Sequence, residues 1–315
     1  MTPKQIEEFT LKNDQLEVRF LNVGGAITKI ALAADDFDQN LVLAYDDKSN
    51  YLNNNIFLNT LVGRTSNRIK DGRFTLNGTS YQLDLNDEPN NLHGGVDNLT
   101  HKIFSVTPME NGYQLKTTLK EDPFPGNLDV TVNYVLEGDT LVVTYEATTD
   151  KTTIVNLTQH AYFNLSGNAK NTVVNHQVTL PANAIAEVDE TSAFTQKQLD
   201  VSGTRFDFNQ VRPIKPANQQ EGYDHLFILS GTNPAATCKD PESGRELIIT
   251  TTEPALQFYS GIWMDDSLTF EGGRKGEKFL GACFETHKVP YDYESQILNP
   301  GETYYQQTKF QFLKK

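Results

Sequence analysis

The chain has 315 residues, of which 37% are hydrophobic and 10% aromatic, enough apolar surface to close a sizeable core. Its 27 Lys and Arg residues are outnumbered by 41 Asp and Glu residues, which gives a formal charge of -14. Because this charge repels the phosphates of nucleic acids and anionic lipid headgroups, we expect neither a nucleic acid nor a membrane as a partner.

The sequence carries no pattern typical of export or of a disulfide framework. The first eight residues lack the apolar stretch of a signal peptide, and no later run is long enough to cross a bilayer, so we expect a cytoplasmic protein. The two cysteines, Cys238 and Cys283, are far apart and have no second pair beside them. This favours reduced, structural thiols over a disulfide or a zinc site.

Apolar residues alternate with polar ones along much of the chain, which predicts strands with one buried face. The pattern occurs at Leu16, Val18 and Phe20, at Val130, Val132, Tyr134 and Leu136, and at Leu141, Val143 and Tyr145. A last strand is expected from Tyr304 to Leu313, after Pro300-Gly301.

Turn residues separate these strands. Asn77-Gly78 and Asn111-Gly112 each stand between two apolar alternations, where a type I′ hairpin turn needs positive φ. Gly138-Asp139 and Ser243-Gly244 are weaker versions of the same signal. We therefore expect several antiparallel hairpins.

Helical periodicity is short wherever it occurs. Its best examples, Thr2 to Phe9 and Val188 to Phe194, would each form a turn or two. Turn signals recur along the whole length without a linker of low complexity or a block of charge. We therefore predict an all-β fold, one large antiparallel β-sandwich domain spanning residues 1–315.

The six histidines do not have the spacing of a metal site. They are His93, His101, His160, His176, His225 and His287, with no His-x-His or His-x-x-x-His pair among them. A Gly-rich phosphate loop and a nucleophile elbow are missing as well, so nucleotide and acyl-transfer chemistry lack support. We expect no metal and no organic cofactor.

Two histidines stand in unusual segments. His93 is bracketed by Pro89 and by Gly94-Gly95, which fits a tight loop where backbone approaches a ligand. His160 would share one face of a strand with Tyr162 and Asn164, a polar patch in an apolar run. For either histidine alone, the ordinary alternative is a hydrogen-bonded structural residue.

Three charged residues are further candidates for a site. Glu285 follows a small and apolar stretch, so we expect its carboxylate at a cleft, where burial raises its affinity for a proton. Asp224 precedes an apolar strand, where a turn or cap residue is the alternative. Arg68 can donate to sugar hydroxyls or hold a carboxylate, with a surface salt bridge as the alternative.

These segments resemble the aldose 1-epimerase family of the galactose mutarotase type over nearly the whole chain. The matching motifs are, in chain order, Gly63-Arg64, Asn67-Arg68-Ile69, Asn91-Leu92-His93-Gly94-Gly95, Pro125-Gly126-Asn127-Leu128, Asn156-Leu157-Thr158 with His160, Tyr162-Phe163-Asn164-Leu165, Val188-Asp189-Glu190-Thr191, Gly203-Thr204, Phe206-Asp207-Phe208, Tyr223-Asp224-His225, Gln257-Phe258-Tyr259, Glu285-Thr286 and Pro300-Gly301-Glu302-Thr303-Tyr304. The number and order of these motifs make a chance match improbable.

The resemblance implies a mutarotase that interconverts the anomers of a free hexose such as galactose or glucose in an open cleft of the sandwich. It implies that Glu285 is the general base and His160 the general acid, and that Arg68, His93 and Asp224 bind the sugar. One acid and one base suffice for this reaction, because a proton must leave the C1 hydroxyl while another reaches the ring oxygen. We expect the cleft to raise the pKa of Glu285 modestly and to keep His160 protonated.

The sequence departs from the family pattern at several places. Val96 and Phe104 stand where the family has an aromatic residue and a Trp, and residues 260–264 and 271–278 are atypical, as is His287. These departures predict a difference in the sugar preferred rather than in the reaction type.

Other functions remain open at this level. A sugar-phosphate 1-epimerase needs cations for the phosphate, which Arg274, Lys275 and Lys278 would supply if they adjoin the site. A glycosidase would use Asp224 and Glu285 but leaves His160 unexplained. A non-catalytic carbohydrate-binding sandwich needs no acid/base pair, and either a monomer or a homodimer fits the sequence.

Overall fold

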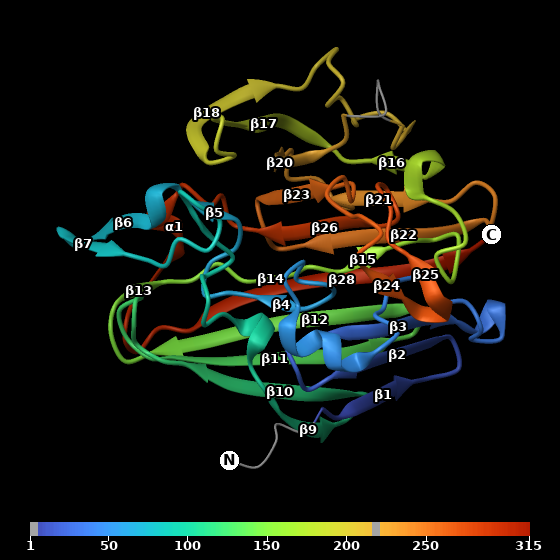
Figure 1. Cartoon of the computed structure of the whole chain (residues 1–315), viewed down its shortest axis with the longest axis horizontal. Coiled ribbons are helices and arrows are strands. Elements are labelled where there is room, and N and C mark those ends of the chain that lie inside the picture. The colour runs from blue at the N-terminus through green and yellow to red at the C-terminus, as the bar shows by residue number, and fades with distance from the viewer. Residues whose placement is uncertain (1–5, 216–220) are drawn as a thin grey trace.

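Two large antiparallel sheets dominate the computed structural model, which describes residues 6–215 and 221–315 (Figure 1). Every strand pair within these residues is antiparallel, and the one α-helix there is a single short turn, α1 (Tyr293–Gln296). The predicted all-β antiparallel sandwich is therefore confirmed.

The larger sheet has nine strands in the order β19-β16-β21-β22-β28-β12-β11-β10-β9. Their bounds are β9 (Ser105–Met109), β10 (Gly112–Leu119), β11 (Leu128–Glu137), β12 (Thr140–Thr149), β16 (Gln177–Thr179), β19 (Arg212–Pro213), β21 (Ala236–Lys239), β22 (Arg245–Thr251) and β28 (Tyr304–Lys314). The last strand, β28, pairs with β12 on one side and β22 on the other, so it joins the two halves of the sheet.

The second sheet has six strands in the order β15-β26-β23-β20-β17-β18. Their bounds are β15 (Tyr162–Phe163), β17 (Ala182–Val188), β18 (Phe194–Asp200), β20 (Asp224–Leu229), β23 (Ala255–Tyr259) and β26 (Ala282–His287). Its inner face packs on the nine-stranded sheet through aromatic rings. Phe258 stacks on Phe284 at 5.0 Å within this sheet, and Phe163 lies 5.6 Å from Phe310 of β28.

A three-stranded sheet covers the other end of the core. It consists of β1 (Glu8–Lys12), β2 (Leu16–Leu21) and β3 (Ile27–Leu32). Phe20 of β2 packs edge-on against Tyr134 of β11, with ring centroids 5.1 Å apart. The N-terminal strands therefore close the hydrophobic core beside β10 and β11 (Figure 1).

Short strand pairs and single helical turns connect these sheets. The pairs are β4 (Leu61–Val62) with β14 (Thr158–Gln159), β5 (Arg68–Ile69) with β8 (Asn91–Leu92), β6 (Arg73–Leu76) with β7 (Thr79–Gln82), β13 (Thr153–Ile154) with β27 (Ile297–Leu298), and β24 (Thr269–Phe270) with β25 (Arg274–Lys275). The 3-10 turns are η1 (Ala33–Asp35), η2 (Lys48–Asn53), η3 (Lys70–Gly72), η4 (Leu99–His101), η5 (Val173–Asn175) and η6 (Glu271–Gly273).

The predicted alternation is confirmed in the core strands. In β11 every second residue from Leu128 to Leu136 is buried, and β12 repeats the pattern from Leu141. Directly opposite pairs such as Val132 with Tyr145 share the core face, which is the unit that stabilises an antiparallel sheet.

The hairpin turns were predicted with mixed success. Asn77 and Gly78 both have positive φ, 50° and 78°, and connect β6 to β7 as expected. The type I′ turn predicted at Asn111-Gly112 is wrong, because Gly112 already pairs with Met109 in the ladder and only Asn111 has positive φ. The sequence signal fits a loop of Asn111 and Gly112 or a loop of Glu110 and Asn111. The pairing of Met109 with Gly112 selects the second loop.

Neither predicted helix is found in the described residues. Residues 2–5 lie outside them, and Glu8 already begins β1. The segment from Val188 to Phe194 is a turn between β17 and β18, because the Asp189 carboxylate accepts hydrogen bonds from the backbone of Thr191 and Ala193. This side chain competes with a helix for the same backbone donors.

Arg64 is a buried structural residue that fastens residues 119–126 to Thr153 of β13. Its side chain is 2% exposed and its guanidinium donates to five oxygen atoms. Four of these acceptors are backbone carbonyls that have few other partners in a buried position, so Arg64 satisfies them together.

Two further expectations from the sequence can be compared with the structure. Cys238 and Cys283 are both buried, free thiols, as predicted. Among the described residues, no helix is long and apolar enough to cross a membrane.

Candidate active site

The outer face of the six-stranded sheet carries polar side chains in the middle of apolar strands. Phe258 and Phe284 point to the core, so their neighbours Gln257 and Glu285 point to the opposite face. Gln257 and Glu285 are directly opposite each other in the β23–β26 ladder. Leu226 of β20 is directly opposite Gln257, and Asp224, two residues before Leu226, therefore points to the same face.

A cavity of about 170 Å³ lies on this face. Its lining contains all five predicted site residues, Arg68, His93, His160, Asp224 and Glu285. They come from five segments of the chain, which are β5, the loop after β8, the segment that follows β14, β20 and β26. The volume is below the ~300–1,000 Å³ typical of pockets for drug-sized ligands, so the cavity suits a ligand of monosaccharide size.

Glu285 and His160 face each other inside this pocket. The His160 Nε2 atom lies 3.6 Å from the Glu285 Oε1 atom, and the two side chains are only 7% and 2% exposed. The second carboxylate oxygen of Glu285 and the Nδ1 atom of His160 have no hydrogen-bond partner among the described residues. Each of the two side chains therefore keeps one polar atom that no other side chain or backbone group of the described residues satisfies.

Burial shifts both groups toward their neutral forms. It raises the pKa of Glu285 well above its usual value, and nearby Asp224 raises it further, although Arg68 opposes this. Burial also lowers the pKa of His160 to about 4. The expected protonated imidazole is therefore wrong, because desolvation penalises a charged ring that has no charged hydrogen-bond partner.

The backbone around His160 differs from the predicted strand. β14 ends at Gln159 and β15 begins at Tyr162, so His160 lies in a break between two short strands. Its carbonyl accepts from the backbone N–H of Asn59 at 3.0 Å. Tyr162 lines the pocket beside His160, whereas Asn164 turns away and donates to the carbonyls of Asn171 and Leu280.

His93 is fixed in one tautomer by the backbone. Its Nδ1 atom accepts the N–H of Asn67 at 3.1 Å, so the ring proton is on Nε2. Gly94, at φ 86°, passes so close to Arg64 that a Cβ atom would lie 2.6 Å from the backbone nitrogen. The tight loop predicted around His93 is confirmed, and glycine is required there.

A chain of hydrogen bonds holds the polar wall of the pocket. The Asn67 amide donates to the Gln257 carbonyl oxygen at 2.9 Å, and the Gln257 amide donates to the Asp224 carboxylate at 2.7 Å. Arg68 is anchored by Asp87 through its Nε atom at 2.6 Å. Burial raises the pKa of Asp224, and the Arg68 charge opposes that shift.

The aldose 1-epimerase family model matches residues 7–311 of this sequence. The chain belongs to the aldose 1-epimerase family. A galactose mutarotase from Bos taurus is 37% identical, and the match covers 98% of this chain and 94% of that protein. An aldose 1-epimerase from Escherichia coli K12 is 32% identical over 82% of this chain and 80% of its own length.

Solved structures agree with this assignment. A galactose 1-epimerase from Lactobacillus acidophilus has a TM-score of 0.89 at 28% identity, covering 100% of this chain and 96% of its own. An aldose epimerase homologue from C. elegans has a TM-score of 0.91 at 24% identity, covering 98% and 99%. As an aldose 1-epimerase, the protein is an isomerase, and its fold is that of the galactose mutarotases.

Several lining residues of this aldose 1-epimerase were missed as site residues in the sequence. They are Asn55, Ile56, Phe57, Asn67, Leu92, Tyr162, Gln257, Tyr259 and Trp263. One sequence signal was available for Gln257, the polar residue within the apolar run of β23. Phe57 had none, because its place beside His93, at 4.6 Å between ring centroids, depends on long-range packing.

The departures from the family pattern fall in different places. Val96 is exposed and Phe104 is buried in the core, and neither lines the pocket, so the altered sugar contacts expected at these two positions are not found. Trp263, in the atypical 260–264 stretch, does line the pocket, and it is 74% exposed. His287 is fully buried on β26 and outside the lining.

A metal ion and a phosphate group both lack suitable partners in this pocket. Ligand atoms of His93, His160 and Glu285 lie within 4.8 Å of one another, a spacing compatible with a metal ion. However, the Asn67 N–H occupies one nitrogen of His93 and the ring proton the other, so His93 has no free lone pair. The basic residues Arg274 and Lys275 line a different cavity, and Lys278 is absent from the lining of this one, so the predicted basic cluster does not adjoin the site.

Proposed function

We propose that the protein interconverts the α and β anomers of a free hexose such as galactose or glucose, with Glu285 as general base and His160 as general acid. The observation that carries this proposal is the 3.6 Å separation of the His160 Nε2 and Glu285 Oε1 atoms inside one buried cavity. The relatives named galactose mutarotase support galactose as a substrate.

The reaction needs only proton transfers. The Glu285 carboxylate takes the proton of the C1 hydroxyl while His160 delivers one to the ring oxygen, and the bond between C1 and the ring oxygen breaks. The resulting aldehyde rotates about the C1–C2 bond and recloses on its other face, with both protons returning. Each positioned acid or base contributes roughly 10²- to 10⁴-fold, which is adequate for a ring opening that also proceeds in water.

One proton shared by the pair is enough for the whole cycle. The shifted pKa values favour a protonated Glu285 and a neutral His160 before a sugar binds. In the proposed cycle, the proton lies on Glu285 while the sugar is the open-chain aldehyde. The cyclic sugar requires this proton to lie on His160, so that Glu285 can act as the base. A bound cyclic sugar must therefore draw the proton from the carboxyl to the imidazole, and Arg68 favours this by stabilising the carboxylate.

The remaining polar residues bind and orient the sugar. With its proton on Nε2, His93 donates a hydrogen bond to a sugar oxygen, and Arg68 donates from its free guanidinium nitrogens. The Asp224 carboxylate accepts from hydroxyl groups while Gln257 holds it in place. Positioning of this kind keeps C1 next to the acid and the base.

Polarimetry on freshly dissolved α-galactose and α-glucose tests the proposal. The protein should accelerate the decay of optical rotation, and a Glu285→Gln variant purified in the same way should not. Failure of the wild-type protein to accelerate the decay would favour the non-catalytic, carbohydrate-binding alternative. Release of a monosaccharide from a disaccharide would instead favour a glycosidase.

A phosphorylated sugar is a poorer fit to the pocket. Among the described residues, Arg68 is the one Lys or Arg in the lining, and Asp87 already forms an ion pair with it. A phosphate group would therefore be left without a free cation. Comparing the rates on glucose and glucose 6-phosphate tests this directly, and faster turnover of the phosphate would contradict the proposal.

We further propose that residues 1–315 act as one domain, in the cytoplasm, on a small-molecule sugar without a cofactor. The hydrophobic core supports the single domain, because its largest cluster of buried residues includes strands from β1 to β28. Either a monomer or a homodimer is compatible with the pocket, which residues of a single chain complete.

A further inference from the structure

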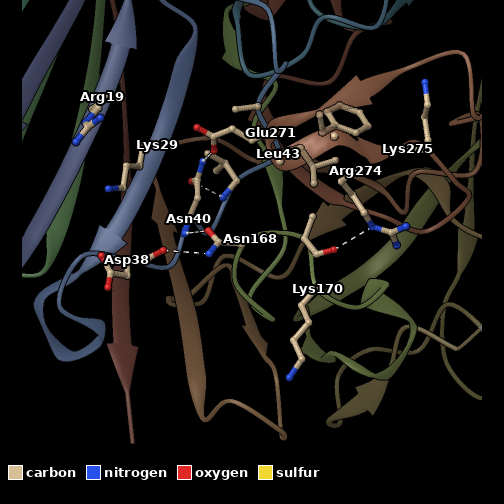
Figure 2. Close-up of a pocket in the computed structure, with 16 residues that line it drawn as sticks. Arg19, Lys29, Asp38, Asn40, Leu43, Asn168, Lys170, Glu271, Arg274 and Lys275 are labelled. Carbon is tan, nitrogen blue, oxygen red and sulfur yellow. Dashed lines mark hydrogen bonds between the residues drawn. The ribbon is translucent and has the colours of Figure 1, made fainter.

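A second and larger cavity lies outside the sugar pocket. Its volume is about 780 Å³, and it shares no lining residue with the sugar pocket. β2 and β3 form one side, and the hairpin of β24 and β25 forms the opposite side (Figure 2). We call it the basic cavity, after the Lys and Arg residues described next.

Cations outnumber acids around this cavity in a chain whose formal charge is -14. Its lining includes five cations, Arg19, Lys29, Lys170, Arg274 and Lys275, and two acids, Asp38 and Glu271. Figure 2 shows Arg19 and Lys29 on one side, with Arg274 and Lys275 across the cavity from them. Cations that surround a concave surface produce a positive potential that attracts anions.

The neighbouring acids neutralise part of this charge, because Arg274 forms an ion pair with Glu277 and the Lys170 Nζ atom lies 3.7 Å from Glu242. Arg19 and Lys29 share a single buried carboxylate, Glu17, with Lys12 as a third cation. Lys275 donates to the Thr269 hydroxyl and forms no ion pair with an acid of the described chain. Positive charge therefore remains on both walls, at Lys275 on one side and at Arg19 and Lys29 on the other.

The stretch 271–278, which the sugar pocket does not explain, forms the basic wall. Gly272 and Gly273 both have positive φ, 71° and 75°, and a Cβ atom on either would meet nothing within 4 Å. The glycines are therefore required by the turn and not by packing. This turn connects β24 to β25 and carries Arg274 and Lys275 to the cavity rim.

We infer that the basic cavity is a second ligand site, which binds a small phosphorylated molecule independently of the sugar. Its volume lies within the ~300–1,000 Å³ range of small-molecule sites. Phosphate oxygens form charge-assisted hydrogen bonds with Lys and Arg, and the amide nitrogen of Asn168, which donates to the Asp38 carbonyl, adds polar surface between the two walls. The Glu271 carboxylate, which accepts from the Asn40 amide, lies in the same lining and opposes the binding of an anion.

Titration with inorganic phosphate and pyrophosphate, at an ionic strength held constant with sodium chloride, tests this inference. Isothermal titration calorimetry should show saturable binding. The double variant Lys29→Gln/Lys275→Gln should weaken it by about tenfold or more, because two charge-assisted contacts are lost. Glu271→Gln should strengthen binding, since it removes a repelling charge next to the ligand.

A matched control separates this site from general charge effects. The double variant Lys197→Gln/Lys309→Gln removes the same charge from exposed positions outside the cavity, and it should bind phosphate like the wild type. Saturating galactose should leave the phosphate affinity unchanged. The inference is wrong if phosphate binds without saturation, if the control weakens binding as much as the cavity variant, or if galactose competes with phosphate.

Discussion

Replacing Glu285 by Gln should remove catalysis without harming the fold. Gln keeps the shape of the side chain but cannot accept a proton, and the side chain is 2% exposed, so no group from solvent takes its place easily. The loss should be about 10²- to 10⁴-fold in kcat, the contribution of one positioned base. At ~1.36 kcal/mol per factor of ten, this corresponds to about 2.7–5.4 kcal/mol of transition-state stabilisation.

The same substitution should not lower stability at neutral pH. The pKa of Glu285 is raised in the folded state, so the folded protein binds this proton more tightly than the unfolded chain does. The contribution of Glu285 to stability is therefore complete below the unfolded pKa near 4.5 and is lost as pH rises through the raised folded pKa. Gln does not ionise, so the melting temperature of the variant at pH 7 should equal or exceed that of the wild type.

Glu253→Gln provides the matched control. Glu253 is also a buried carboxyl with a raised pKa, but it lies outside the sugar pocket. Its replacement should leave the polarimetric rate on α-galactose near that of the wild type. A Glu285→Gln variant that retains a rate within about threefold of the wild type would refute the assignment of the general base.

Three further predictions concern pH, sugar binding and stability. Activity needs one proton shared by Glu285 and His160. On the acid side kcat/KM should fall near pH 4, where His160 is protonated while Glu285 still carries its own proton, and on the alkaline side it should fall as Glu285 loses its proton. A value of kcat/KM that does not change with pH would contradict this. Gln257→Leu should raise KM for galactose by about tenfold while kcat changes little, because Asp224 loses the amide that positions it. Unchanged steady-state kinetics would contradict a role of Gln257 in positioning Asp224. Arg64→Leu should lower the free energy of unfolding by about 3 kcal/mol or more in urea titrations, because buried carbonyls lose their donor. A loss under about 1 kcal/mol would show that these carbonyls find other partners.

Local patterns were sufficient to predict the core strands. In β11 the alternation of apolar residues matches the buried face residue by residue, and in β12 it does so except at Val142, which is also buried, because a period of two leaves one register for the core. The same local logic failed at Asn111-Gly112, where two adjacent residues both tolerate positive φ and the pairing of Gly112 with Met109 decides between them. A turn signal therefore locates a hairpin to within one residue.

The five candidate site residues lie together in the structure, but the resemblance to a family indicated their grouping and the local patterns did not. Spacing alone cannot show that His160 and Glu285 meet, since 124 intervening residues separate them and the sheet order brings them together. The protonation state of His160 was predicted wrongly for a similar reason. Its pKa depends on desolvation by residues such as Phe57 and Tyr162, which only the folded chain places around the ring.

The central place of β28 in the nine-stranded sheet has a consequence for folding in the cell. Between the end of β12 at Thr149 and the start of β22 at Arg245 lie 95 residues, and each of these strands needs β28 as its neighbour. Until residues 304–314 leave the ribosome, both strands expose open edges that can pair with other chains. Nascent chains truncated before Tyr304 should therefore depend on chaperones and aggregate when these are depleted, whereas the completed chain should not.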